Sequence, residues 1–257
     1  YEVVYNGIAP AVPQNLAVVP GDEQVTLSWD ANSEEDLDNY YIYGEEGYSL
    51  SFDGEDDWID LPEEMLLSNE PRTIMALVNP QDDNVIYSSF TNSTGEYSLT
   101  SYNFNLKGSD GQWYSAGASI ESIPYGEWVL ITGVWDQNNI YFYHNNDLLS
   151  QTEMVGNLIT GTFNGQTVIG NSGAHFNSPF NGDISFAAVW NRALTQGEIS
   201  QIYLSNYFID VSEDLIAHWN FDEGSGTTLT DLSGNGNDGI INGATWSTDV
   251  ACSACGC

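Results

Sequence analysis

The stretch Tyr48-Ser-Leu-Ser-Phe-Asp-Gly54, followed by Glu55-Asp-Asp-Trp-Ile-Asp-Leu-Pro62, sets the pattern of this chain. Over the rest of the sequence, short runs rich in Val, Ile, Tyr, Phe and Trp alternate with clusters of Gly, Asn, Asp and Ser. Helical periodicity is scarce. Short runs of β-branched and aromatic residues between turn-forming clusters are typical of strands, so the sequence predicts an all-β sandwich.

Several segments carry this pattern clearly. In Val25-Thr-Leu-Ser-Trp-Asp30 apolar and polar side chains alternate, as they do on a half-buried strand. Three more strands are predicted at residues 139–144, 167–170 and 184–190. One helix is predicted, because Thr195-Gln-Gly-Glu198 is a capping box and the apolar residues Ile199, Ile202 and Tyr203 follow at helical spacing.

The composition excludes several classes of protein. The 257 residues contain 37 Asp and Glu but only 3 Lys and Arg, for a formal net charge of −34. With 41% hydrophobic and 13% aromatic residues, the chain is not intrinsically disordered. Three basic residues, Arg72, Lys107 and Arg192, form no basic patch, which argues against nucleic acid and anionic membranes as partners. The charged partners that remain are cations.

The sequence shows no targeting segment. Its first residues lack the basic start and apolar stretch of a signal peptide, and the apolar run at residues 128–135 is far too short to span a bilayer. A secreted protein looks like this once its signal has been removed, and we expect an extracellular or cell-surface location. The sequon Asn92-Ser93-Thr94 and the acidic composition agree with that, although a lineage-wide composition bias explains the acidity equally well.

The opening stretch, residues 48–62, resembles the entry of the laminin-G-like, concanavalin A-like jelly-roll family. Further family elements follow in order, at residues 73–80, 126–136, 168–171 and 180–199. The resemblance covers residues 48–206 and implies an antiparallel jelly-roll sandwich. Two departures stand out. Leu77 takes the place of a common Trp, and Ser185-Phe186 replace an acidic pair, so any metal or ligand role of that pair in relatives is not expected here.

Residues 13–46 resemble the opening of a fibronectin type III domain. The resemblance rests on Pro13-Gln-Asn-Leu16, Leu27-Ser-Trp-Asp30 and Tyr40-Tyr-Ile-Tyr43, which cover about three of that fold's seven strands. So few strands leave open edges. The segment must therefore pack on the next domain, receive strands from another chain, or be completed by sequence absent here. Residues 1–12 form an N-terminal extension.

The block Ile216-Ala-His-Trp-Asn-Phe-Asp222 and its continuation to Trp246 come last here, whereas in the family they precede the entry. The block either closes the same sandwich by circular permutation or opens a second, truncated domain. Closure is favoured because the termini of a sandwich usually lie close together. We therefore expect a sandwich over residues 47–248, with 214–248 as the closing block and a Cys-rich tail at 249–257.

A metal site is predicted within Asp231-Leu-Ser-Gly-Asn-Gly-Asn-Asp238. Oxygen-bearing residues at alternate positions, followed by glycine, have the spacing of a calcium loop, and the family resemblance implies a structural Ca²⁺ here. The alternative is a turn without an ion. The expected ligands are Asp231, Ser233, Asn235 and Asn237, with Asp238 and Asp183 as additional ones. A second acidic cluster, Glu55-Asp56-Asp57, is interpreted as a solvated loop.

The sandwich also suggests carbohydrate, because sugar sites on such folds combine an aromatic platform with Asn-, Asp- and Gly-rich loops. The ligand-binding candidates are Trp58, Trp113 and Tyr114, with Trp128 also available, although most Trp side chains of a sandwich belong to its core. His144, His175 and His218 are interpreted as structural or surface residues. Catalysis is not expected: the chain lacks the paired-acid strand motif of glycoside hydrolases, a nucleophile elbow and a phosphate loop.

All three cysteines, Cys252, Cys255 and Cys257, lie in the last six residues. We expect intermolecular disulfides there, with a local disulfide or a metal site as alternatives. With the partial leading domain and the apolar Val3-Val4-Tyr5, the tail favours assembly with other copies of the chain or with neighbouring surface proteins. The favoured function is a calcium-stabilised, non-enzymatic adhesion or structural module, in a surface or filamentous assembly. The alternative is a carbohydrate-binding, lectin-like module of a larger secreted protein.

Overall fold

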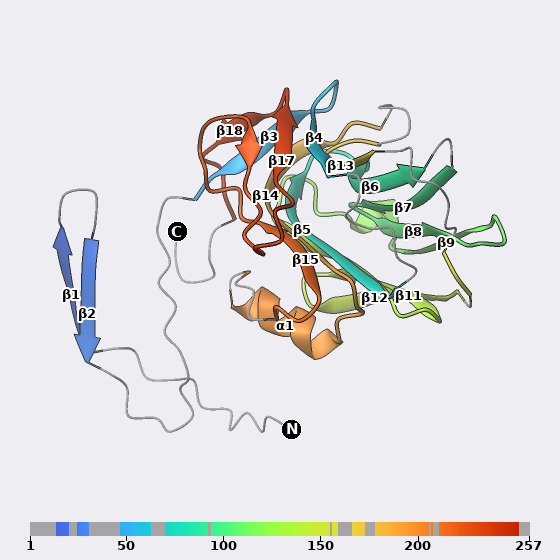
Figure 1. Ribbon diagram of the computed structural model, residues 1–257, viewed down its shortest axis with the longest axis horizontal. Helices are drawn as coiled ribbons and strands as arrows, with labels where there is room; N and C mark the ends of the chain where they lie inside the picture. The colour runs from blue at the N-terminus through green and yellow to red at the C-terminus, as the bar shows by residue number, and fades with distance from the viewer. Residues whose placement is uncertain are drawn as a thin grey trace. The chain divides into compact units, whose positions relative to one another are not determined.

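The computed structural model describes residues 14–20, 25–30, 47–62, 70–91, 94–154, 156–158, 166–172, 178–205, 207 and 211–251 (Figure 1). The chain divides into two compact units, Tyr1–Glu45 and Glu46–Cys257. In the first unit, β1 (Gln14–Pro20) and β2 (Val25–Asp30) pair antiparallel, which confirms the strand predicted at 25–30. The third strand of the fibronectin type III-like segment, at 40–43, lies outside the described residues.

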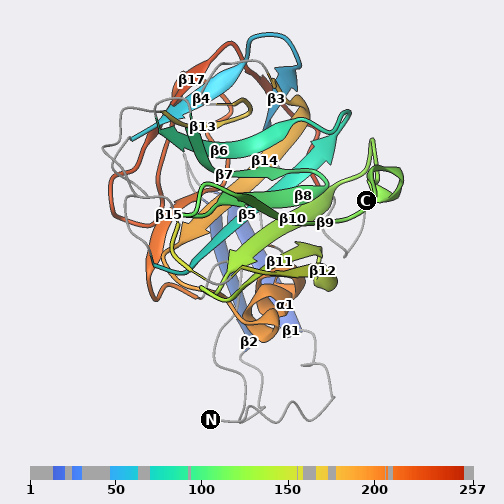
Figure 2. The ribbon, with the colours of Figure 1, turned by 90° about the vertical axis from the view of Figure 1, so that its right-hand side faces the viewer.

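The second unit is a sandwich of two eight-stranded antiparallel sheets (Figures 1 and 2). The first sheet has the order β12-β11-β10-β5-β14-β3-β18, and β15 also pairs with β14. Its strands are β3 (Ser49–Asp53), β5 (Arg72–Pro80), β10 (Val129–Trp135), β11 (Asn139–His144), β12 (Asp147–Glu153), β14 (Asn181–Trp190), β15 (Leu215–Trp219) and β18 (Thr245–Ser247). This architecture confirms the predicted all-β sandwich, and β11 and β14 lie where the sequence placed strands.

The second sheet has the order β16-β17-β4-β13-β6-β7-β8-β9. Its strands are β4 (Trp58–Leu61), β6 (Val85–Thr91), β7 (Thr94–Thr100), β8 (Asn103–Lys107), β9 (Trp113–Gly117), β13 (Thr167–Ile169), β16 (Thr228–Leu229) and β17 (Gly239–Asn242). A short 3₁₀ helix, η2 (Ile120–Ser122), follows β9. Strand β9 is therefore an edge of this sheet, and it is the edge on which the candidate site described below is built.

The core lies between the two sheets, and alternation along each strand fills it. On β8, Phe104 and Leu106 are fully buried while Asn103, Asn105 and Lys107 point away. The Phe104 ring packs against Gly133 of β10, which leaves no room for a side chain at that position. Period-two alternation of this kind fixes the register, because a shift by one residue would turn Phe104 outward.

The outer face of the first sheet is also covered. All nine residues of β5 and all seven of β10 are buried, because α1 (Gln196–Leu204) packs its Ile199 and Ile202 over that face. The predicted capping box is confirmed: the Glu198 backbone amide donates to Thr195 Oγ1, and the Thr195 amide donates to Glu198 Oε2 at 2.7 Å. Within the described part of the chain, no helix is long and apolar enough to cross a membrane.

The closing block of the sequence contributes strands to both sheets. β15 pairs with β14 and β18 with β3 in the first sheet, while β17 pairs with β4 in the second. Because β4 and β3 come from the start of the unit, strands from its two ends lie side by side (Figure 1). Strands from the block at 214–248 thus pair with strands of both sheets.

Candidate functional site

A polar face with one exposed tryptophan lies on the outside of the second sheet, over β7, β8 and β9. Its register places Lys107 opposite Trp113 and Asn105 opposite both Ser98 and Ser115. The neighbours of these residues along each strand point into the core, so this set shares the outward side. We call it the Trp113 face: Ser98, Asn103, Asn105, Lys107, Trp113 and Ser115.

Hydrogen bonds hold the polar side chains of this face in a row. Asn105 Nδ2 donates to Asn103 Oδ1 at 2.7 Å and to Ser98 Oγ at 3.2 Å. Thr100 Oγ1 donates to Asn103 Oδ1 at 3.0 Å. The row fixes the orientation of two amides on a rigid sheet, where both still have atoms open to a ligand.

Trp113 supplies the aromatic surface of the face. Its side chain is 51% exposed, and the Lys107 ammonium lies 5.7 Å from the centre of its ring. An indole presents a large apolar plane, against which the C–H face of a sugar or another flat apolar group can pack. A half-exposed Trp beside oriented amides is therefore suited to a ligand that is apolar on one side and polar at its rim.

Tyr114 does not join Trp113 in a common platform. As the next residue on β9 it points to the opposite side, where it packs against the core, and its hydroxyl donates to Asp110 Oδ2 at 2.7 Å. The Gln112 amide also donates to Asp110, at 2.9 Å. These two bonds hold the pKa of Asp110 below its usual value, and the same carboxylate raises the pKa of Tyr114. The pair fixes the turn that carries Trp113.

Trp58 and Trp128 lie elsewhere. Trp58 is half-buried on β4, five strands from β9, which is about 24 Å across the sheet. Trp128 packs against the apolar cluster beneath α1. Of the four aromatic candidates from the sequence, the structure therefore leaves Trp113 as the exposed one, and it does not bring Trp58 and Trp113 into one site.

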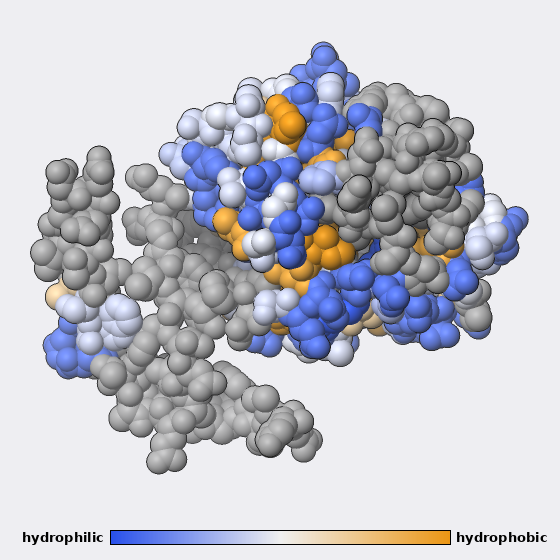
Figure 3. Space-filling view, viewed as in Figure 1, coloured by the Kyte–Doolittle hydropathy of each residue, from blue (hydrophilic) through white to orange (hydrophobic). Residues whose placement is uncertain are grey.

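Other exposed apolar side chains are scattered. On the side shown in Figure 3, hydrophobic residues occur in separate patches among hydrophilic ones. Isolated apolar side chains at a surface are normal and indicate no site by themselves. Tyr125, 44% exposed, is the aromatic residue most like Trp113 in exposure, and it follows η2 rather than lying on the sheet face.

The predicted calcium loop is held by its own hydrogen bonds. Asp231 is 8% exposed, and its Oδ1 accepts from the amides of His218 and Ser233 at 3.0 and 2.9 Å. Its Oδ2 accepts from Ser233 Oγ at 2.8 Å and the Asn237 amide at 2.9 Å. Burial raises the pKa of Asp231, but the backbone donors outweigh burial and the pKa lies below its usual value. Both carboxylate oxygens therefore already carry two donors each.

The remaining predicted ligands are also engaged or distant. Asn235 and Asn237 each donate through Nδ2 to the Ile216 carbonyl, at 3.0 and 2.9 Å, and Asp238 accepts from the Asp231 amide at 2.8 Å. Asp183 faces Ser51, roughly 15 Å along β14 from the residue opposite His218. The structure thus brings the loop residues together but not Asp183. As arranged, both oxygens of Asp231 accept bonds from within the protein, and calcium binding here stays a prediction.

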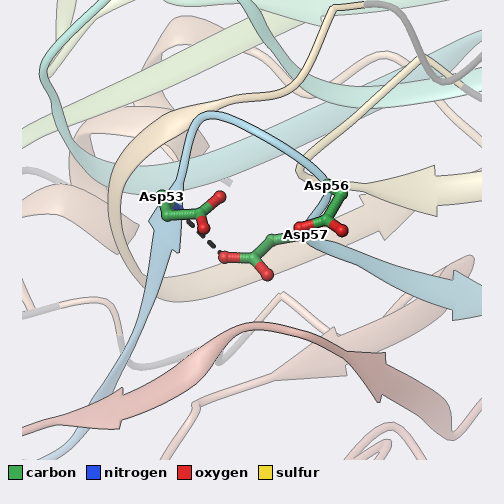
Figure 4. Close-up of side chains that lie close together, drawn as sticks. All are labelled: Asp53, Asp56 and Asp57. Carbon is green, nitrogen blue, oxygen red and sulfur yellow. Dashed lines mark hydrogen bonds between the residues drawn. The ribbon is translucent and has the colours of Figure 1, made fainter.

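The turn between β3 and β4 holds a tighter group of carboxylates (Figure 4). One ligand oxygen from each of Asp53, Asp56 and Asp57 lies within 4.8 Å of the others, a grouping found nowhere else among the described acidic, His and Cys residues. Interpreting this cluster as a solvated loop was wrong for Asp57, which is 5% exposed and accepts from the Asp53 amide at 2.9 Å. Burial raises the pKa of Asp57, the Asp53 amide opposes this, and the charges of Asp53 and Asp56 add to the rise.

Two of the three histidines have described environments. His144 Nε2 lies 3.1 Å from the Ser101 carbonyl, and burial lowers its pKa. His218 is packed against Phe186, and burial lowers its pKa to about 4, although the nearby Asp231 charge opposes the shift. Both are structural, as expected. His175 and the cysteines at 252, 255 and 257 lie outside the described residues.

Sequence reasoning did not find Ser98, Asn103, Asn105 and Lys107. A usable signal was present in Asn103-Phe-Asn-Leu-Lys107, where polar residues at every second position must share one face of a strand. The turn with Gly108 and Gly111 then returns the chain at Trp113, so a hairpin prediction would have placed that ring beside Lys107.

Residues 53–200 of this chain match the family model of the concanavalin A-like lectin/glucanases superfamily. Among solved structures, one described as a "putative carbohydrate binding protein" from Bacteroides ovatus aligns with a TM-score of 0.64 and 17% identity, over 88% of this chain and 68% of that one. A heptameric pentraxin from Limulus polyphemus aligns with a TM-score of 0.50 and 17% identity, over 78% of this chain and 97% of its own. At these identities the likeness concerns the fold alone. A comparison with curated protein sequences gives no match.

Proposed function

This chain belongs to the concanavalin A-like lectin/glucanases superfamily, and from that premise we propose that it is a carbohydrate-binding module that takes its ligand on the Trp113 face. The observation that carries the proposal is that the half-exposed Trp113 ring shares one face of the sheet with the oriented amides of Asn103 and Asn105. The sugar's C–H face stacks on the indole, and its hydroxyls exchange hydrogen bonds with the amide row. The description of the Bacteroides ovatus protein as carbohydrate-binding supports the same assignment.

The proposal replaces the adhesion module as the favoured function, because the Trp113 face is a built surface for a small polar ligand. As a binding module of this kind, the protein acts outside the cell, where free and surface glycans are found. Assembly with other copies of the chain stays a prediction, since it rests on residues 1–12, 31–46 and 252–257, which lie outside the described part.

A glycan array with the full chain and three single variants tests the proposal. Trp113→Ala should remove binding to every glycan that the unaltered protein retains, because truncating a central aromatic anchor commonly costs 2 kcal/mol or more, roughly 30-fold in affinity. Tyr125→Ala is the matched control, an aromatic of similar exposure away from the face, and should bind as before.

The third variant, Trp58→Ala, locates the site. If Trp58→Ala removes binding and Trp113→Ala does not, the ligand sits at the other end of the sheet and the proposed site is wrong. Binding that survives in all three variants, or no glycan retained by the unaltered protein, would reject a carbohydrate site on this sheet altogether.

A further inference from the structure

The chain has only three basic side chains, and the structure has committed two of them to its own fold. Arg72 is fully buried, with its guanidinium 4.8 Å from the centre of the Tyr97 ring. Arg192 is clamped by Glu198 through two bonds, Nη1 to Oε2 at 3.1 Å and Nη2 to Oε1 at 2.6 Å, and its Nε donates to the Glu213 carbonyl. Neither can meet a ligand at the surface without giving up these contacts.

Lys107 is the third, and it lies on the Trp113 face. Within the described part of the chain, Arg192 and Glu198 form the one ion pair. The Lys107 ammonium instead contacts the Trp113 ring. The nearest acid in sequence, Asp110, has its two oxygens bonded to the Gln112 amide and the Tyr114 hydroxyl. The three ammonium donors of Lys107 are therefore available to a ligand held against the ring.

Resting on the proposed function, we infer that the glycan bound at Trp113 carries an anionic group, a carboxylate or a sulfate, which pairs with the Lys107 ammonium. A charge-assisted hydrogen bond is roughly twice as strong as a neutral one, and the apolar ring beneath it lowers the local screening by water. A neutral sugar would use the ring and the amides but leave this donor unused.

The overall charge of −34 should restrict the binding of anionic ligands to the surroundings of Lys107. At long range the surface repels every anion, but at about 0.15 M salt this repulsion is screened beyond about 8 Å. Contact with Lys107 is shorter than that distance, so the local pair persists while the general repulsion does not. Anionic ligands are thereby rejected over most of the surface and accepted at one place.

Two matched probe pairs, measured by titration calorimetry with the full chain in 0.15 M NaCl, test the inference. The carboxylate pair is tetragalacturonic acid and its fully methyl-esterified form; the sulfate pair is 3′-sulfated lactose and lactose. We expect at least one anionic member to bind about tenfold more tightly than its neutral partner. Lys107→Gln should abolish that difference and Lys107→Arg should keep it, with the melting temperature of both variants unchanged.

The outcomes separate this inference from the proposed function. If the anionic and neutral members bind equally, or if Lys107→Gln leaves a preference intact, while Trp113→Ala still removes binding, the face binds neutral glycans and the inference is overturned alone. If none of the four probes binds in the millimolar range, the inference is overturned as well, and the glycan array then decides the proposed function. A preference lost in both Lys107 variants would assign Lys107 to packing rather than to charge recognition and would likewise overturn it.

Discussion

The loop at residues 231–238 and the Trp113 face both place Asn and Ser side chains near a tryptophan, but their hydrogen bonds differ in where they lead. In the loop, Asp231 accepts four bonds from its surroundings, and Trp219 donates its ring N–H to the Asn237 carbonyl at 3.0 Å. On the Trp113 face, the ring of Trp113 is half exposed, and the ammonium of the half-buried Lys107 lies 5.7 Å from the centre of that ring.

Residue composition therefore indicates several candidate sites, and the hydrogen-bond partner of each polar group distinguishes between them. A polar cluster whose groups are satisfied internally stabilises the fold, because each buried group would cost free energy if left unpaired. A polar cluster whose groups are oriented but open can exchange water for a ligand. Sequence spacing favoured the loop as a site. The hydrogen bonds favour a structural role for the loop, and they agree with the binding role proposed for the Trp113 face.

The largest expected effect is on stability, from Asp231→Ala. The change leaves the amides of His218, Ser233 and Asn237 without their acceptor in a buried setting. We expect a loss of about 3 kcal/mol in the free energy of unfolding, which for a domain of this size lowers the melting temperature by roughly 6–12 °C. Thermal unfolding followed by circular dichroism measures it.

The same scan in 1 mM CaCl₂ and in 1 mM EDTA tests whether the loop holds an ion. If the loop is held by its own hydrogen bonds, the loss is the same in both. A loss seen only with calcium, together with a lower melting temperature of the unaltered protein in EDTA, would identify the loop as the calcium site that its spacing predicted. Asp110→Ala is the control, since this exposed Asp also caps a turn, and its loss should lower the melting temperature far less than Asp231→Ala does.

The next effect in size is the pH dependence of stability, through His218. Its pKa is lowered to about 4 in the folded protein, against 6.5 for an unperturbed histidine. Between these values the unfolded chain binds a proton that the folded protein does not, so stability is present above pH 6.5 and is lost as the pH falls toward 4. The full difference corresponds to about 3 kcal/mol. His218→Gln should flatten the dependence of the melting temperature on pH in this window, and an unchanged slope would contradict the assignment to this residue.

The architecture could be predicted from the sequence because the core obeys short-range rules. Strand β11 and the capping box of α1 were predicted at the right residues, since alternation and capping depend on neighbours in the chain. The burial of Asp57 was not predicted, because it depends on Gly243, which lies against its carboxylate from almost 190 residues away in the chain. No local pattern carries that information.

The site was predicted only in part. Trp113 was among the candidates, but the sequence contains eight tryptophans. Which of them is exposed depends on the folded sheet, so the sequence could not single out Trp113. That β9 is an edge strand, and that Trp58 lies five strands away, follows from the strand order, which long-range pairing sets. That Arg72 and Arg192 are engaged within the fold also follows from tertiary contacts, those with Tyr97 and Glu198.

A smaller effect is expected from Asn105→Ala, which removes the amide at the centre of the polar row. The loss of one or two hydrogen bonds to a ligand should weaken glycan binding about fivefold, close to 1 kcal/mol. The melting temperature should stay nearly constant, because the face is open to water. Asn242→Ala is the matched control. Its amide donates to Asp60 on the same sheet, and its strand β17 lies five strands from β8, so the change should leave binding unchanged. A large fall in melting temperature for Asn105→Ala would show that the row serves the fold, as the loop does.

The smallest effect is expected on the stability of Trp113→Ala, and it separates the Trp113 face most clearly from the loop at 231–238. Half of this ring already faces water, so its removal forfeits little buried area, and the contact with Lys107 is worth about 0.5–1 kcal/mol at an exposed position. The melting temperature should therefore change by no more than about 2–4 °C, in the same scan that registers the full loss in Asp231→Ala. A small change in stability together with lost glycan binding would identify Trp113 as a residue that serves binding and not folding. If Trp113→Ala instead destabilises as much as Asp231→Ala, the ring is part of the fold's support, and the two regions do not differ in the way their hydrogen bonds suggest.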